Sequence, residues 1–256
     1  MISRRRGSSP ALGAAAFFCA AGALLLLPFA AGCGGSGGDP VGVTLPASVV
    51  TRSNEQAYSE DAKILAARAA QGAWLSADEA ARIDRELGRI RDANPAVRNI
   101  HARPAFQLHD LLVRVRTSAS WRDRWRAGQV TTGQAALDGL LNEYGPSRVD
   151  AQPLIAGAEE EWFVLHFDQS LNMPKLAQLF AAASPDVTGA NANQTLGDGD
   201  DITVSENAAG GRTYTFSVGW GDCQAGCISR HYWEFAVAAD GTPTPLGERG
   251  DPLPTL

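Results

Sequence analysis

The chain has 256 residues, of which 45% are hydrophobic, 20% are charged and 7% are aromatic. That balance excludes a fully disordered or collagen-like chain, and the length allows one large domain or a small domain with a tail. The 22 basic and 28 acidic residues leave a formal net charge of −6. Because phosphate contacts need clustered Lys or Arg, and no basic block is present, we expect no nucleic-acid partner.

The first residues have the pattern of an export signal. Three arginines at positions 4–6 precede an uncharged stretch over 11–32, with four consecutive leucines at 24–27. A positive start followed by an apolar run is typical of a secretory signal peptide. The apolar run is also long enough for an uncleaved anchor helix, which is the alternative interpretation.

The small residues at 30–32 directly precede Cys33, and together they resemble the lipobox of bacterial lipoproteins. That resemblance implies a signal peptide over 1–32 and an acylated Cys33 that anchors the chain to a lipid bilayer. Gly34 stands where inner-membrane lipoproteins carry Asp, so the resemblance implies an outer-membrane protein facing the periplasm or the cell surface. Several buried acyl chains on one cysteine hold firmly, at about 0.8 kcal/mol per methylene.

A flexible tether and a helical lead-in follow. Residues 33–50 are rich in glycine and predict flexible coil. Residues 51–100 predict a short helix at 62–68 and a longer one that begins at a capping box formed by Ser76 and Glu79. The longer helix has an apolar face with helical spacing, formed by Ala80, Ile83, Leu87 and Ile90.

Residues 101–196 alternate between strand and helix patterns. The predicted elements are strands at 108–116, 148–155, 162–167 and 187–193, and helices at 132–144 and 172–183. The order βαββαβ is that of the ferredoxin-like arrangement. Right-handed crossovers would place both helices on one face of a four-stranded sheet. The fold class predicted for the chain is therefore α+β.

Residues 106–196 resemble the propeptide domains of subtilisin-like proteases. The resemblance rests on the segments LLVRV, WFVLHF and LNMPKLAQLF, and on PDV followed by ANANQ. In that family the domain binds the protease and assists its folding, with a C-terminal segment in the active cleft. No Asp, His and Ser set of a protease follows in this chain, so the resemblance implies the scaffold and leaves inhibition open.

Residues 197–240 predict a β-hairpin extension, with strands at 201–205, 213–218 and 231–238. The tail from 241 to 256 is rich in Pro and Gly, and we expect it to be loose.

The densest group of reactive residues lies at 219–233, between two predicted strands. It resembles a GDCxxGCIxRHxW signature of uncharacterised bacterial secreted proteins. Cys19 and Cys33 fall in the signal and at the acylation site, which leaves Cys223 and Cys227. Outside the cytoplasm these two should form a disulfide that staples the hairpin.

Two other interpretations of this group stay open. The cysteines could form a redox disulfide, although thiol-exchange enzymes use C-x-x-C at a helix start. They could instead bind metal with His231 and Asp222, although the spacing fits no standard zinc pattern. Trp220 and Trp233 would cover the disulfide or, if exposed, form a binding face.

A second acidic cluster follows the last strand of the βαββαβ region. Asp198, Asp200 and Asp201 could bind calcium, but no Glu completes an EF-hand loop, so we interpret the segment as a polar turn. Residues 159–161 are three glutamates and predict a charged turn. The sequence further predicts that His109 and His166 are packed or lie on an outer sheet face, and that Trp121 and Trp125 pack in the core.

No nucleophile elbow, P-loop, dinucleotide fingerprint or HExxH motif is present, so we predict neither an enzyme nor a cofactor. The favoured hypothesis is an exported lipoprotein that binds a protein partner, with protease inhibition as its concrete form. The alternative is a metal- or redox-active envelope protein centred on Cys223, Cys227 and His231. A purely structural envelope component is the third hypothesis.

Overall fold

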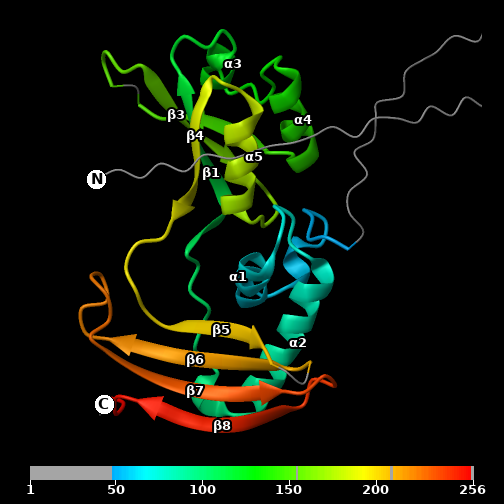
Figure 1. The fold of residues 1–256 in the computed structure, drawn as a ribbon, viewed down its shortest axis with the longest axis vertical. Coiled ribbons are helices and arrows are strands. Elements are labelled where there is room, and N and C mark those ends of the chain that lie inside the picture. Colours follow the sequence, from blue (N-terminus) through cyan, green and yellow to red (C-terminus); the bar gives the residue numbers. More distant parts are fainter. Residues whose placement is uncertain (1–47, 154, 208–209, 255–256) are drawn as a thin grey trace, which may run out of the picture. The chain divides into compact units, whose positions relative to one another are not determined.

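The computed structural model describes residues 48–153, 155–207 and 210–254 (Figure 1). The predicted signal, the acylation site Cys33 and nearly all of the tether lie outside these residues. Every described element belongs to one compact unit, Val43–Leu256. Both hydrophobic cores lie in this unit, so it contains what it needs to fold without residues 1–42. The described chain is α+β, with five α-helices and two four-stranded antiparallel sheets.

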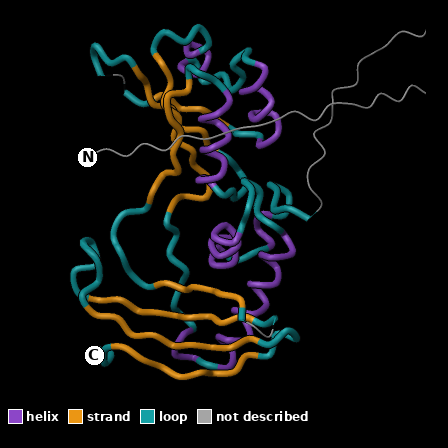
Figure 2. The backbone as a smooth tube through the Cα atoms, in the orientation of Figure 1, coloured by secondary structure: helices purple, strands orange, loops and turns teal. Residues whose placement is uncertain are grey.

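The first sheet has the order β2-β3-β1-β4, and all its neighbouring strands are antiparallel. Its strands are β1 (Phe106–Arg116), β2 (Arg148–Ala151), β3 (Glu160–His166) and β4 (Val187–Gln194). Between them lie the helices α3 (Arg122–Arg126), α4 (Ala135–Tyr144) and α5 (Met173–Ala183). The tube view shows these helices as a layer beside the strands (Figure 2).

Alternation along the strands explains which face of the first sheet is covered. Leu111, Val113 and Val115 of β1 are fully buried and pack in one core with Leu141 of α4 and Phe180 of α5. The residues between them therefore point to the opposite face. Since each helix buries one apolar stripe on this core, both helices cover the same face of the sheet.

Local chemistry fixes the ends of these helices. Pro174 stands in the first turn of α5, where a missing amide costs nothing, and the Asn172 side chain accepts a hydrogen bond from the Lys175 amide. The helix predicted over 132–144 begins only at Ala135. The Asp138 carboxylate explains the delay, because it accepts hydrogen bonds from the amides of Thr132 and Gly133 at 2.7 and 2.8 Å and fixes them as a loop.

The second sheet has the order β5-β6-β7-β8, with each strand antiparallel to the next. Its strands are β5 (Asp201–Glu206), β6 (Arg212–Trp220), β7 (Ser229–Val237) and β8 (Pro243–Gly250). The prediction of a loose tail from residue 241 is wrong, because β8 pairs with β7 from Val237↔Pro243 to His231↔Gly250. Pro and Gly marked the segment as coil, yet an edge strand tolerates them since one side of it makes no ladder bonds.

The helices α1 (Glu60–Ala69) and α2 (Ala77–Ala93) do more than lead into the fold. They share a core with the second sheet, and Figure 1 shows both helices beside its strands. Leu65, Ile83 and Leu87 of the helices and Phe216 and Phe235 of the strands are almost completely buried in it. The predicted hairpin extension is therefore part of a sheet with its own helical layer. Two short 3-10 helices, Glu55–Ala57 and Pro95–Val97, flank α1 and α2.

The helix α2 begins at the predicted cap, but its glutamate has another partner. The Ser76 hydroxyl accepts from the Glu79 amide at 3.2 Å. The Glu79 carboxylate accepts from Arg212 of β6 at 2.6 Å, which joins the helix to the second sheet. The core between α1, α2 and the second sheet, which we call the second core, also contains an ion pair between Arg212 and Glu86. The Glu86 carboxylate accepts a 2.6 Å hydrogen bond from the Tyr214 hydroxyl.

Candidate functional site

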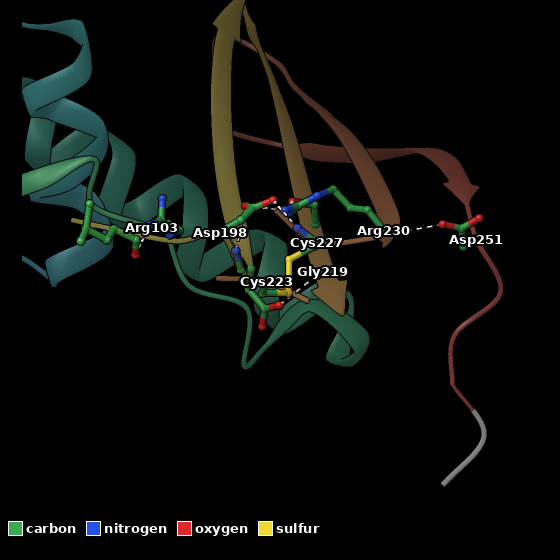
Figure 3. Close-up of a disulfide and its surroundings, with 11 residues drawn as sticks. Arg103, Asp198, Gly219, Cys223, Cys227, Arg230 and Asp251 are labelled. Carbon is green, nitrogen blue, oxygen red and sulfur yellow. Dashed lines mark hydrogen bonds and ion pairs between the residues drawn. A yellow bond between two sulfur atoms is a disulfide. The ribbon is translucent and has the colours of Figure 1, made fainter. Parts of the chain in front are cut away.

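The turn between β6 and β7 holds the predicted disulfide, Cys223–Cys227 (Figure 3). Gly219 makes room for it, because a Cβ atom at this position would lie 2.5 Å from the Cys227 sulfur. Gly221 has a backbone φ of +96°, which residues other than glycine rarely adopt. Gly219, just before the motif, therefore leaves space for the sulfur, and Gly221, the first residue of the motif, allows the turn.

Arg230 connects the turn to the segment before β5. Its guanidinium donates to the Asp198 carboxylate at 2.6 Å and to the Ser217 hydroxyl at 2.9 Å. The Cys227 amide donates to the other oxygen of Asp198 at 3.1 Å. These bonds, first the one from Arg230 and then those from the amides of Gly199 and Cys227, lower the pKa of Asp198 to about 2.

The three aspartates of the acidic cluster have separate partners. Asp198 accepts from Arg230, whereas Asp200 accepts from the Gly219 amide at 3.2 Å. Asp201 accepts from Arg68 at 2.9 Å and from the Arg103 amide at 2.8 Å. Their bonds favour the predicted polar turn, because hydrogen-bond donors rather than a shared cation satisfy the carboxylates.

His231 faces the C-terminal segment. Its Nδ1 lies 2.8 Å from the Asp251 carbonyl, and its ring lies 4.5 Å from the ring of Trp233. Trp233 is 6% exposed and belongs to the second core, whereas Asp222 is exposed and Trp220 is half-buried. The structure therefore places His231 and Trp233 side by side on β7, Trp220 at the end of β6 and Asp222 in the exposed turn.

The chemistry available at the turn is limited by its disulfide. The bond uses both thiols, and neither cysteine begins a helix in the described chain. Among the described residues, no group of three or more His, Cys, Asp or Glu side chains is placed to hold a metal ion. The turn instead joins three segments, because Arg230 binds Asp198 through its side chain and Asp251 through its amide at 3.0 Å (Figure 3).

A surface on the first sheet has more of the character of a binding site. Trp162 of β3 is 36% exposed, and its ring lies 5.4 Å from the guanidinium carbon of Arg114 on β1. The register places these two residues opposite each other, on the face that α4 and α5 do not cover. We call this surface the open face, and define it by Leu112, Arg114, Glu160, Trp162 and His166.

Trp162 lines two hollows. One measures about 580 Å³ and also contacts Leu112, Asn191 and residues of α5. The other measures about 490 Å³ and is lined by Arg114, Ile155 and the glutamates at the start of β3. An exposed tryptophan between two depressions offers a partner both an apolar contact and room for its own side chains.

The charged groups of the open face neutralise one another. Arg114 lies 3.2 Å from Glu160, and the two ring nitrogens of His166 lie 2.8 Å from Asp110 and 3.0 Å from Asp150. This face thus combines the apolar side chains of Leu112 and Trp162 with charged groups that have partners.

The three glutamates at 159–161 only partly match the predicted turn. Glu160 and Glu161 belong to β3, and Glu161 is 2% exposed with Arg122 and Arg126 at 3.6 and 3.4 Å. Trp121 and Trp125 are 3% and 0% exposed, which confirms the prediction that they pack in the core. Trp162 itself was missed, because strand alternation alone does not tell which face the helices leave bare.

A buried polar cluster was also missed. Glu55 is 4% exposed and accepts hydrogen bonds from the Ser170 hydroxyl at 2.6 Å, the Ser170 amide at 2.9 Å and Lys63 at 2.9 Å. Burial alone would raise the pKa of Glu55, but the bonds from Ser170 and Lys63 outweigh it and lower the pKa below its usual value. His109 lies 3.4 Å from the Ser170 hydroxyl, yet that hydroxyl is completely buried and donates to Glu55, so the cluster is structural.

Among residues 48–153, 155–207 and 210–254, no helix is long and apolar enough to cross a membrane. Comparisons of the chain with protein-family models, with curated proteins and with solved structures find no match.

Proposed function

We propose that the chain is a lipid-anchored, exported protein-binding module that acts without catalysis, and that the open face of the first sheet is its binding surface. The observation that carries the proposal is Trp162, an exposed aromatic side chain between two hollows on an uncovered sheet face. We further propose that residues 106–194 have the ferredoxin-like arrangement, which the strand order β2-β3-β1-β4 and the helices between the strands support.

The composition of the open face favours a protein as the partner. Trp and Arg are the residue types that most often dominate the binding energy of protein interfaces, and here Arg114 stacks on Trp162. Arg114 pairs with Glu160 and Arg148 pairs with Asp150, so these charges cancel at the border of the face. A partner surface with an apolar centre and a polar rim complements this arrangement.

The anchor belongs to the same proposal. An acylated Cys33 and the tether after it would hold the binding module at a membrane surface. The resemblance of residues 106–196 to subtilisin propeptides makes a protease of that class the concrete partner to test. The open face would then contact the protease surface, and whether a segment also enters its active cleft is a separate outcome of the test.

The experiment compares the full-length chain with two variants in which one exposed apolar side chain is removed. Trp162→Ala alters the open face, whereas Ile228→Ala removes a 78% exposed side chain from the disulfide turn. We expect a partner captured from envelope extract, and then measured as a purified protein, to bind wild type and Ile228→Ala equally. It should bind Trp162→Ala about 30-fold more weakly, which corresponds to about 2 kcal/mol for a hot-spot residue.

A partner that binds Trp162→Ala as tightly as wild type would disprove the assignment of the open face. A subtilisin-type protease assay with increasing amounts of the chain separates the two forms of the proposal. Protease binding is supported if the wild-type chain slows proteolysis and Trp162→Ala does not. A rate that the wild-type chain leaves unchanged removes the protease as the partner.

A further inference from the structure

The free edges of the two sheets differ in how they are protected from pairing with another strand. An edge strand exposes unpaired amide and carbonyl groups, and proteins protect such edges with charged residues, prolines or short strands. The edge strand β2 has four residues, of which Arg148 and Asp150 are charged. The edge strand β5 begins and ends with a charged residue, Asp201 and Glu206.

The edge strand β8 contains Pro243 and Pro245, and it ends with the charged pair Glu248 and Arg249 before Gly250. The remaining edge, β4, has eight residues with the sequence VTGANANQ. It contains no charged residue and no proline. Of the four edges of the described sheets, β4 is the one that carries neither of these protections.

The centre of β4 is also regular. Its pairing with β1 runs without a break from Leu111↔Ala192 to Arg114↔Gly189, and the two register shifts lie outside this run. The Arg114 guanidinium donates to the Thr188 carbonyl at 3.3 Å, so a charged group lies at the N-terminal end of β4. The rest of the regular run, residues 190–192, is where another strand could pair with this edge.

The surface beside this edge is uncharged as well. On α5, the side chains of Gln178, Leu179, Ala181 and Ala182 are exposed, and Leu179 is 41% exposed. The hollow of about 580 Å³ joins this helix face to β4, since Pro174, Gln178 and Ala181 line it together with Ala190 and Ala192. Edge and helix thus form one continuous uncharged surface on a chain with 50 charged residues (22 + 28).

We propose that a second copy of this chain covers this surface, with β4 pairing antiparallel to β4 of the copy and α5 packing against its counterpart. A two-fold axis at the centre of β4 brings the same residues together from both sides, so each edge satisfies the amide and carbonyl groups of the other. Both surfaces lack charge, so the negatively charged copies approach each other without like charges in contact. Small side chains on α5 allow the two helices to lie close.

This pairing would join the first sheet of one copy to the first sheet of the other, which gives one eight-stranded sheet. Both Trp162 side chains would then lie on the same face, so a dimer presents two open faces to a partner or to two sites on it. The inference is argued from the edge and α5 and stands without the proposed function, although the two share one hollow. The hollow of about 580 Å³ that the copy would cover is also lined by Trp162, so a dimer would leave a partner the hollow of about 490 Å³.

The first test is sedimentation equilibrium of the Val43–Leu256 unit over a range of concentrations. We expect a concentration-dependent dimer. Asn191→Lys, at an exposed position in the centre of β4, and Ala181→Glu, on the exposed face of α5, should each weaken it about tenfold or more, because like charges then meet across the axis. Thr203→Lys makes the same kind of change at an exposed position of the edge strand β5, and should leave the dimer unchanged.

The second test is oxidative cross-linking of the full-length chain with Asn191→Cys, and with Thr203→Cys as the control. A product of twice the chain mass is expected for Asn191→Cys and not for the control. A monomer at every concentration, a dimer that resists both charged variants, or cross-links from residue 191 only to other proteins would each overturn the proposal. Circular dichroism of each variant shows whether it has folded. Residues 181, 191 and 203 are all exposed, so the changes should not disturb a core.

Discussion

The two sheets of this chain have the same number of strands but differ in what they leave exposed. In the second sheet the long edge, β8, carries prolines, a disulfide closes one turn, and Arg212 binds Glu79 and Glu86 of the covering helix. The first sheet leaves Trp162 on a bare face and an uncharged edge at β4. The first sheet therefore carries the two features on which our proposals rest, an exposed tryptophan and an edge without charge, whereas the second sheet is closed by these links.

A large effect on stability should come from the ionic cluster under the second sheet. Arg212 is 4% exposed, and its replacement by Ala removes the cation that Glu79 binds and leaves Glu86 with Arg82 as its ion-pair partner. Removal of one partner of a buried pair costs about 3 to 5 kcal/mol of unfolding free energy. Urea unfolding of the Val43–Leu256 unit measures the loss. Arg249→Ala, which breaks an exposed pair with Glu234 on the same sheet, should cost about 1 kcal/mol or less.

A comparable loss for Arg212→Ala and Arg249→Ala would contradict the view that the second half depends on this cluster. The cluster also includes Tyr214, whose pKa is raised first by burial and then by its hydrogen bond to Glu86. Burial also raises the pKa of Tyr144, so a titration of tyrosine absorbance should show two tyrosines that ionise only above the ordinary pKa of 10.0.

The next effect concerns Glu55, which ties the segment before α1 to Ser170. Glu55→Gln keeps the shape but removes the charge that Lys63 and Ser170 stabilise, at a cost of about 2 kcal/mol. Because the pKa of Glu55 is lowered in the folded chain, its contribution is complete above the ordinary value of 4.5 and is lost as the pH falls through the folded value. The stability difference between wild type and Glu55→Gln should thus shrink in acid.

Urea unfolding at several pH values tests this dependence. Glu60→Gln is the matched control, since Glu60 also lies 3.0 Å from Lys63 but its side chain is 60% exposed. It should cost little, and a difference for Glu55→Gln that grows in acid would show that the assigned direction of the pKa shift is wrong.

A smaller effect is expected for the disulfide. The double variant Cys223→Ser, Cys227→Ser opens a loop with a sequence separation of four, so the entropic loss should be about 2 kcal/mol or less. Thermal unfolding of wild type with and without reductant should give the same difference. A loss as large as that of Arg212→Ala would mean that the turn organises the second sheet rather than closing one end of it.

Much of this architecture follows from periodicity in the sequence. The apolar spacing in α2 and the alternation in β6 predicted those elements correctly, since each buries one side on a core. The spacing of Cys223 and Cys227 predicted the disulfide that the structure contains. Pairing between distant segments could not be predicted: β8 became a strand only because β7 offers it an edge.

The candidate site shows the same limit. Trp162 lies in the segment WFVLHF, where two apolar neighbours conceal which face is bare. Its exposure depends on helices α4 and α5, which belong to other parts of the chain. Glu55 and Ser170 are 115 positions apart, so no local pattern could join them.

The smallest effect on stability should come from Trp162, the residue that we propose for partner binding. Trp162→Ala removes a 36% exposed side chain and its contact with Arg114, which costs about 1 kcal/mol or less. Trp125→Ala removes a completely buried tryptophan from the core of the same half, and should cost about 3 to 5 kcal/mol. Urea unfolding of both variants compares one residue type in two settings. A loss for Trp162→Ala near that for Trp125→Ala would place Trp162 among the residues that hold the sheet together, and weaker binding by that variant would then reflect unfolding rather than a lost contact.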